Sequence, residues 1–272
     1  MLLDGDGPKK ENYININNNS LPENILITCR QDVFDKNLYL AKFCLEIEKY
    51  EDAIRYIEEI VKSKEEELSE EERNVFVMIY RCYITEKRNA WKTLYNQEEK
   101  EKITKSKYGT MINEIRREIE EVIKTTSERI INLINNYILK KVFSNEGKAF
   151  FYKVKGDYYR YLSEISYGEA LSSSRQNALQ NYKDSVTFSS DIQPLNIIKL
   201  GNFLNFAVFQ YEVMNNTNAA ISLARQALND ASIELKIVGS DALIADDLRD
   251  SLRIIQILKR IIMIGFKKMK IR

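Results

Sequence analysis

The sequence predicts an all-α fold. The chain has 272 residues but only 9 Gly and 3 Pro, so few residues interrupt regular structure. Apolar residues recur with helical spacing along most of the chain, and no strand–turn–strand pattern is visible. A chain of this length can bury a large core in one or two domains. We therefore expect long helices that pack on one another.

The N-terminal half begins with a polar leader and continues as long helices. Residues 1–22 are rich in Asn, Gly and Asp and contain two prolines, which indicates a mobile leader. Ser69 precedes Glu72 by three residues, a capping box that predicts a helix start. The charged stretch 98–107 is expected to be a helix end or a loop. The helices predicted in this half are 24–48, 51–63, 69 into the 90s, and 108–143.

The C-terminal half is predicted to contain shorter helices separated by turn residues. Gly147 is expected to break the chain before the helix that carries 155–164. The serine run 172–174 is expected to be a loop or helix entry, and Pro194 to start a later helix. The other elements are a helix at 175–188, a turn at 215–218, a helix to about 237, a capped turn at 239–241 and a last helix into the mid-260s. The total is about nine helices.

Two basic pairs, each spaced by seven residues, lie in predicted helices. The first is Arg81 and Arg88; the second is Lys153 and Arg160, followed by Tyr161. Seven residues span about two helical turns, so each pair projects from one helix face. If the two helices pack together, these side chains form a cationic cup with a phenol at its rim. One guanidinium group can donate two parallel hydrogen bonds to two oxygens of a phosphate, and a hydroxyl adds one more donor.

Four segments resemble the 14-3-3 family in order and spacing. They are RNVFVMIYRCYITEKRNAW (73–91), KGDYYRYLSE (155–164), LGNFLNFAVFQYE (200–212) and LRDSL (248–252). The resemblance covers roughly residues 31–260. It implies a bundle of about nine antiparallel helices with a concave amphipathic groove. It also implies a cytoplasmic, non-enzymatic signalling adaptor that binds phosphoserine or phosphothreonine in client proteins and regulates their activity or location.

The resemblance also implies roles for individual residues. The phosphate-binding residues would be Arg81, Arg88, Arg160 and Tyr161. The peptide groove would be lined by Lys153, Asn74, Leu204, Asn205, Val208, Glu212, Ser251 and Ile255. Asp157 and Glu164 are expected to orient the arginines. The competing interpretation is that the basic residues are solvated helix charges paired with nearby acids, Glu86, Asp157 and Glu164 among them.

The last helix departs from the family pattern. Ser251 stands where the family has a peptide-gripping Asn, Ile255 where it has a groove Trp, and Asp247 where it has a groove Leu. Losing one amide of a two-point clamp costs about 1–3 kcal/mol. We therefore expect weaker binding or an altered sequence preference beyond the phosphate. A phosphate-independent helical scaffold, with a degraded or self-occluded groove, is the alternative function.

The dimer contacts of the family are also altered. A homodimer through the N-terminal helices would use Lys49 and Asp52, and the resemblance pairs them with Glu118 and Val122. A like charge and an apolar group at these two places weaken the usual contact. The leader within 1–30 is a candidate to replace it.

The composition argues against several other classes of protein function. The chain has no His, no P-loop and no Gly-rich nucleotide motif, and its three cysteines lack zinc spacing, so no catalytic site, metal or cofactor is predicted. A net charge of +1 gives no argument for nucleic acid. The most apolar stretch, 254–264, is broken by polar residues, which excludes stable membrane insertion.

The resulting organisation is a polar extension at 1–30, the helical domain at 31–260 and a terminal segment at 261–272. That segment is apolar and then basic. The plainest interpretation is the solvated end of the last helix. The alternatives are an anchor for an anionic surface or a cover for the chain's own groove.

Overall fold

The computed structural model describes residues 23–104, 108–238 and 246–270, and within these ranges it is all-helical. This confirms the predicted fold class, with nine α-helices and one π-helix in the described part. The helices are α1 Glu23–Glu46, α2 Tyr50–Ser63, α3 Glu70–Thr104, α4 Gly109–Leu133, η2 Ile134–Ile138, α5 Asn145–Ile165, α6 Gly168–Phe188, α7 Ile197–Glu212, α8 Thr217–Val238 and α9 Asp246–Lys270.

The N-terminal elements begin and end close to their predicted bounds. The capping box is present, because the Ser69 N–H donates to Glu72 Oε2 at 2.7 Å and the Glu72 N–H donates to Ser69 Oγ at 3.2 Å. The helix predicted at 108–143 is divided. Its last turns form the π-helix η2, in which the Leu139 N–H reaches the carbonyl of Ile134 at 2.8 Å.

Three boundaries in the C-terminal half were predicted wrongly. Gly147 lies in the first turn of α5, because the hydroxyl of Ser144 accepts its N–H and caps the helix. The serine run 172–174 lies inside α6, which begins earlier at Gly168, a residue with φ of +57°. Asn196, not Pro194, caps α7. The turn predicted at 239–241 lies outside the described residues.

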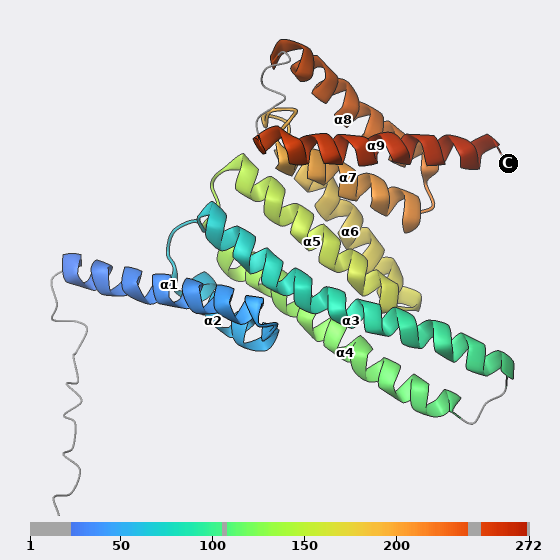
Figure 1. Cartoon of the computed structure of the whole chain (residues 1–272), viewed down its shortest axis with the longest axis horizontal. Helices are drawn as coiled ribbons and strands as arrows, with labels where there is room; N and C mark the ends of the chain where they lie inside the picture. Colours follow the sequence, from blue (N-terminus) through green and yellow to red (C-terminus); the bar gives the residue numbers. More distant parts are fainter. Residues whose placement is uncertain (1–22, 105–107, 239–245, 271–272) are drawn as a thin grey trace, which may run out of the picture.

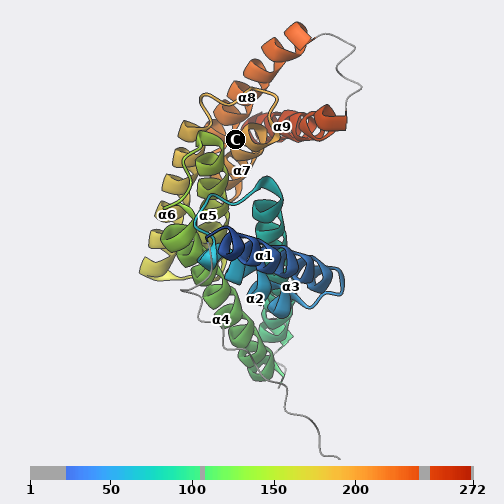
Figure 2. The ribbon, with the colours of Figure 1, turned by 90° about the vertical axis from the view of Figure 1, so that its left-hand side faces the viewer.

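The helices form two connected groups (Figure 1). One core lies among α1 to α5, η2 included, and a second lies among α7, α8 and α9. Helix α6 packs on α5 and contacts α7, which joins the groups. In the rotated view, α3 and α9 both project from the same side of the α5–α6 pair (Figure 2).

A close approach fixes the α5–α6 contact. A Cβ added to Gly156 would lie 2.9 Å from ring carbons of Tyr182, so only glycine fits there without a shift. This contact aligns the part of α5 that carries the second basic pair. Among the described residues, no helix combines the length and apolarity that a membrane crossing needs.

Candidate functional site

Helices α3 and α5 bring Arg88, Arg160 and Tyr161 together. The guanidinium carbon of Arg88 lies 3.9 Å from the ring centroid of Tyr161, and that of Arg160 lies 4.9 Å from it. Both cations therefore lie over the ring of one phenol, an arrangement that cation–π attraction favours. The spacing predicted one face on each helix, and the two faces were expected to meet if the helices pack together, as they do here. From here on, the cup means Arg88, Arg160 and Tyr161, a smaller set than the one predicted from the sequence.

Glu164 fixes the orientation of Arg88. Arg88 Nε donates to Glu164 Oε2 at 2.8 Å and Arg88 Nη2 donates to Oε1 at 2.6 Å. This paired geometry holds the planar guanidinium in one position. A guanidinium has five N–H donors, so three remain after Glu164 has taken two. The predicted orienting contact from this acid is present.

Asp157 fixes the other side of the cup. Its carboxylate is 3.0 Å from Lys153 Nζ and 3.8 Å from Arg160 Nη2. It also accepts hydrogen bonds from the Tyr182 hydroxyl at 2.6 Å and from Asn205 Nδ2 at 2.9 and 3.1 Å. One buried carboxylate thus joins α5, α6 and α7, as a satisfied polar network does.

These contacts set the protonation states of the site. Burial alone would raise the pKa of Asp157, but the charges of Lys153 and Arg160 outweigh burial and hold the pKa below its ordinary value. Burial, reinforced by Asp157, raises the pKa of Tyr161, so its phenol stays protonated and can donate. Burial disfavours the charge of Arg160, yet Tyr182 and Asp157 raise its pKa overall, and the guanidinium stays charged.

Arg160 also has a donor without an acceptor. Its Nε is buried and has no hydrogen-bond partner among the described residues. A buried N–H without a partner is costly, and Arg73 Nε on α3 and Arg175 Nε on α6 share this state, so the feature alone does not single out the cup.

Arg81 lies near the cup but outside its network. It is on α3, two turns before Arg88, and its side chain is exposed. It makes no hydrogen bond or ion pair with any described residue. No described acidic side chain therefore neutralises its charge. Asn74, two further turns toward the start of α3, is also exposed.

Helix α7 supplies the residues expected along the peptide. Leu204, Asn205 and Val208 are half-buried and Glu212 is exposed. Because Asn205 donates its Nδ2 to Asp157, its side-chain oxygen is left as an acceptor. The contact couples this amide to the carboxylate that holds Arg160.

The two residues expected from α9 face the interior. Ser251 is 2% exposed, and its hydroxyl donates to the carbonyl of Leu195 at 2.7 Å. Ile255 is 5% exposed and belongs to the core of α7–α9. The structure therefore does not bring either side chain to an open surface beside Asn205. The Asp247 side chain lies outside the described residues.

Tyr182 is the residue of the site that sequence reasoning missed. It is fully buried on α6, its ring stacks on Phe206 at 5.8 Å, and its hydroxyl bonds to Asp157. A tyrosine at a core position of a helix carries no pattern that distinguishes it from other apolar residues. Only the packing of α6 on α5 reveals its role.

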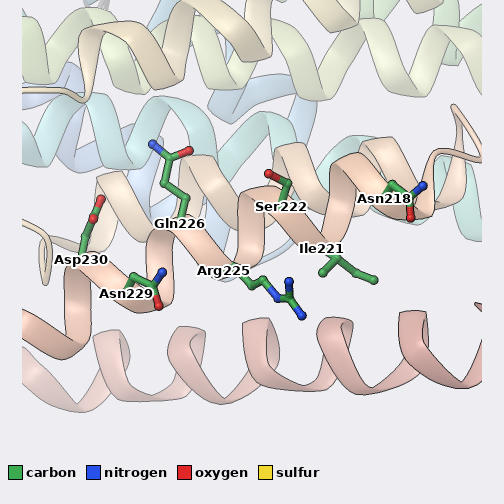
Figure 3. A pocket seen from close by; sticks show the side chains of 7 residues that line it. All are labelled: Asn218, Ile221, Ser222, Arg225, Gln226, Asn229 and Asp230. Carbon is green, nitrogen blue, oxygen red and sulfur yellow. The ribbon is translucent and has the colours of Figure 1, made fainter.

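A surface hollow of about 500 Å³ lies along α8 (Figure 3). Its lining is mainly polar, and Arg225 is its one cation while Ile221 is its one apolar residue. It contains none of the cup residues. Among the described residues, no group of three or more His, Cys, Asp or Glu side chains is placed to hold a metal.

The fold and site define a class: an all-helical protein in which one buried and one half-buried carboxylate, Asp157 and Glu164, hold two arginines beside a phenol. The sequence model of the family described as "14-3-3 protein" matches residues 40–264. The chain belongs to the 14-3-3 family.

Curated relatives agree with this assignment. The chain is 34% identical over 228 residues to "14-3-3-like protein A" of Glycine max, covering 83% of this chain and 87% of that protein. It is 35% identical over 237 residues to "Checkpoint signal transducer rad24" of Schizosaccharomyces pombe, covering 85% and 83%. It is 32% identical over 228 residues to "14-3-3-like protein GF14 psi" of Arabidopsis thaliana, covering 83% and 88%.

Proposed function

We propose that the protein is a cytoplasmic adaptor that binds phosphoserine or phosphothreonine in client proteins and regulates their activity or location. Family membership supports a phosphopeptide-binding adaptor role. The observation that carries the proposal is the meeting of Arg88, Arg160 and Tyr161, with unpaired Arg81 nearby. The proposal assigns the protein no catalytic role, metal or cofactor.

The phosphate group distinguishes a phosphorylated client from the unmodified one. It brings about −1.5 to −2 charge and three acceptor oxygens, which an unmodified hydroxyl lacks. The N–H groups of Arg88 that Glu164 does not use and the Tyr161 hydroxyl offer donors to these oxygens, and Arg160 adds a charge beside them. Arg81 adds a charge that no described acid neutralises. Binding then masks or remodels the client.

The peptide is proposed to run from the cup along α7. The Asn205 oxygen accepts a backbone N–H, and Leu204 and Val208 contact apolar side chains. Lys153, Asn74 and Glu212 flank this path. Since Ser251 and Ile255 face the core, α9 supplies no second amide clamp, which gives weaker binding or a changed preference beyond the phosphate.

Fluorescence titration tests the proposal. A labelled phosphoserine peptide and its unphosphorylated twin are titrated with the wild type and with Arg88→Ala. We expect the wild type to bind only the phosphopeptide and the variant to lose at least about tenfold in affinity. Equal binding of both peptides, or an unchanged variant, would replace this function with the phosphate-independent scaffold. That alternative is favoured by one observation: Glu164 already pairs with Arg88.

A homodimer through the N-terminal helices is part of the proposal. Helix α1 exposes Tyr39 and Phe43 four residues apart, and Ile47, in the turn that follows α1, is exposed as well, so the three form one apolar stripe. Helix α4 exposes Met111 and Ile115 in the same way. In a two-fold dimer, the α1 stripe of one protomer would cover the α4 stripe of its partner. Sedimentation at micromolar concentration is expected to show a dimer that Phe43→Ser weakens; a wild-type monomer would end this part of the proposal.

A further inference from the structure

The C-terminal half of α9 has an outer face that the fold does not use. Ile255 and Leu258 on its inner face are buried in the core of α7–α9. On the opposite side, Ile257 is 43%, Met263 60% and Ile264 51% exposed. Large apolar side chains at helical spacing on an outer face indicate a partner surface.

The same face is strongly cationic. Lys259 and Arg260 are exposed and have no ion pair with any described residue. From Ser251 to the end of the sequence there is no acidic residue, while the basic residues are Arg253, Lys259, Arg260, Lys267, Lys268, Lys270 and Arg272. The helix continues to Lys270 and extends beyond the ends of α7 and α8 (Figure 1). Of the basic side chains that the structure describes here, Arg253, Lys259 and Arg260 are all exposed.

We propose that the outer face of α9 docks on an anionic lipid bilayer surface. The exposed isoleucines and Met263 would enter the headgroup boundary, while Lys259 and Arg260 extend to lipid phosphates and carboxylates. Exposed apolar side chains beside unpaired cations, with no acidic residue from Ser251 onward, give this face a charge complementary to an anionic lipid surface. Docking would hold a bound client at the membrane.

Vesicle co-sedimentation of the full chain tests the inference. The probes are phosphatidylcholine vesicles, with and without about one third phosphatidylserine. We expect binding only to the anionic vesicles, and weakening when salt rises from about 0.1 M to about 0.5 M. Lys259→Gln with Arg260→Gln is expected to lower the partition coefficient about thirtyfold. Ile257→Ser with Ile264→Ser is expected to lower it at least about tenfold.

Matched controls separate this surface from general charge effects and from the cup. Lys92→Gln with Lys183→Gln removes two exposed cations from α3 and α6, and binding is expected to be unchanged. The α9 variants are expected to keep wild-type phosphopeptide affinity. Absent or composition-independent vesicle binding would overturn the inference. Full vesicle binding by both α9 variants would also overturn it, by assigning the lipid contact to another surface.

Discussion

Replacing Asp157 with Asn is expected to destabilise the fold by about 3–5 kcal/mol. The change keeps the shape of the side chain but removes a charge that is only 7% exposed. Arg160, whose side chain is 16% exposed, would be left as a buried cation without its acid. Lys153 is 26% exposed and can turn toward water, so it adds less. The new amide hydrogens would also face the Nδ2 donor of Asn205.

Urea unfolding followed by circular dichroism measures this cost. Asp250→Asn is the matched control, because Asp250 and Arg253 form an ion pair at the same i,i+3 spacing, at 2.8 Å, on an exposed surface. That change is expected to cost less than about 1 kcal/mol. If Asp157→Asn costs no more than Asp250→Asn, the argument that one buried carboxylate organises the site is wrong.

Three further predictions concern the helix contact at Gly156, the protonation of Asp157 and the charge of Arg81. Gly156→Ala is expected to cost about 1–3 kcal/mol in urea unfolding, since its Cβ would lie 2.9 Å from an aromatic ring of α6. Gly201→Ala, with nothing within 4 Å, is expected to be neutral or stabilising. Because the pKa of Asp157 is lowered, its stabilisation is present above pH of about 3.8 and is lost below it. The wild-type advantage over Asp157→Asn should therefore vanish in acid; an advantage that grows there contradicts the assignment. Arg81→Ala is expected to weaken phosphopeptide binding about tenfold at unchanged stability, while exposed Arg117→Ala changes neither.

The sequence predicted the cup because its residues are local pairs on two helices. Seven-residue spacing places Arg81 with Arg88 on one helix face and Lys153 with Arg160 on another, but the meeting of the two faces was predicted only on the condition that the helices pack together. The roles of Asp157 and Glu164 also followed, because acids three or four residues from a basic residue, or on the facing helix, are natural partners.

Long-range contacts could not be predicted in this way. The link from Asn205 to Asp157 spans 48 residues, and Tyr182 reaches Asp157 from a third helix. The inward direction of Ser251 depends on the Leu195 carbonyl, which the rotation of α9 brings within reach. Packing sets the rotation of each helix and its tertiary hydrogen bonds. Sequence periodicity predicts which side chains share a helix face, but not which helix that face contacts.

Phosphorus NMR of a bound phosphoserine peptide tests the central claim most directly. The second pKa of a free phosphoserine is about 6. Cations around the phosphate favour the dianion, so we expect this pKa to fall by at least about one unit in the complex, and less with Arg88→Ala. A phosphorus resonance that titrates as in the free peptide, at saturating protein, would contradict the account by showing that the phosphate does not sit in the cup.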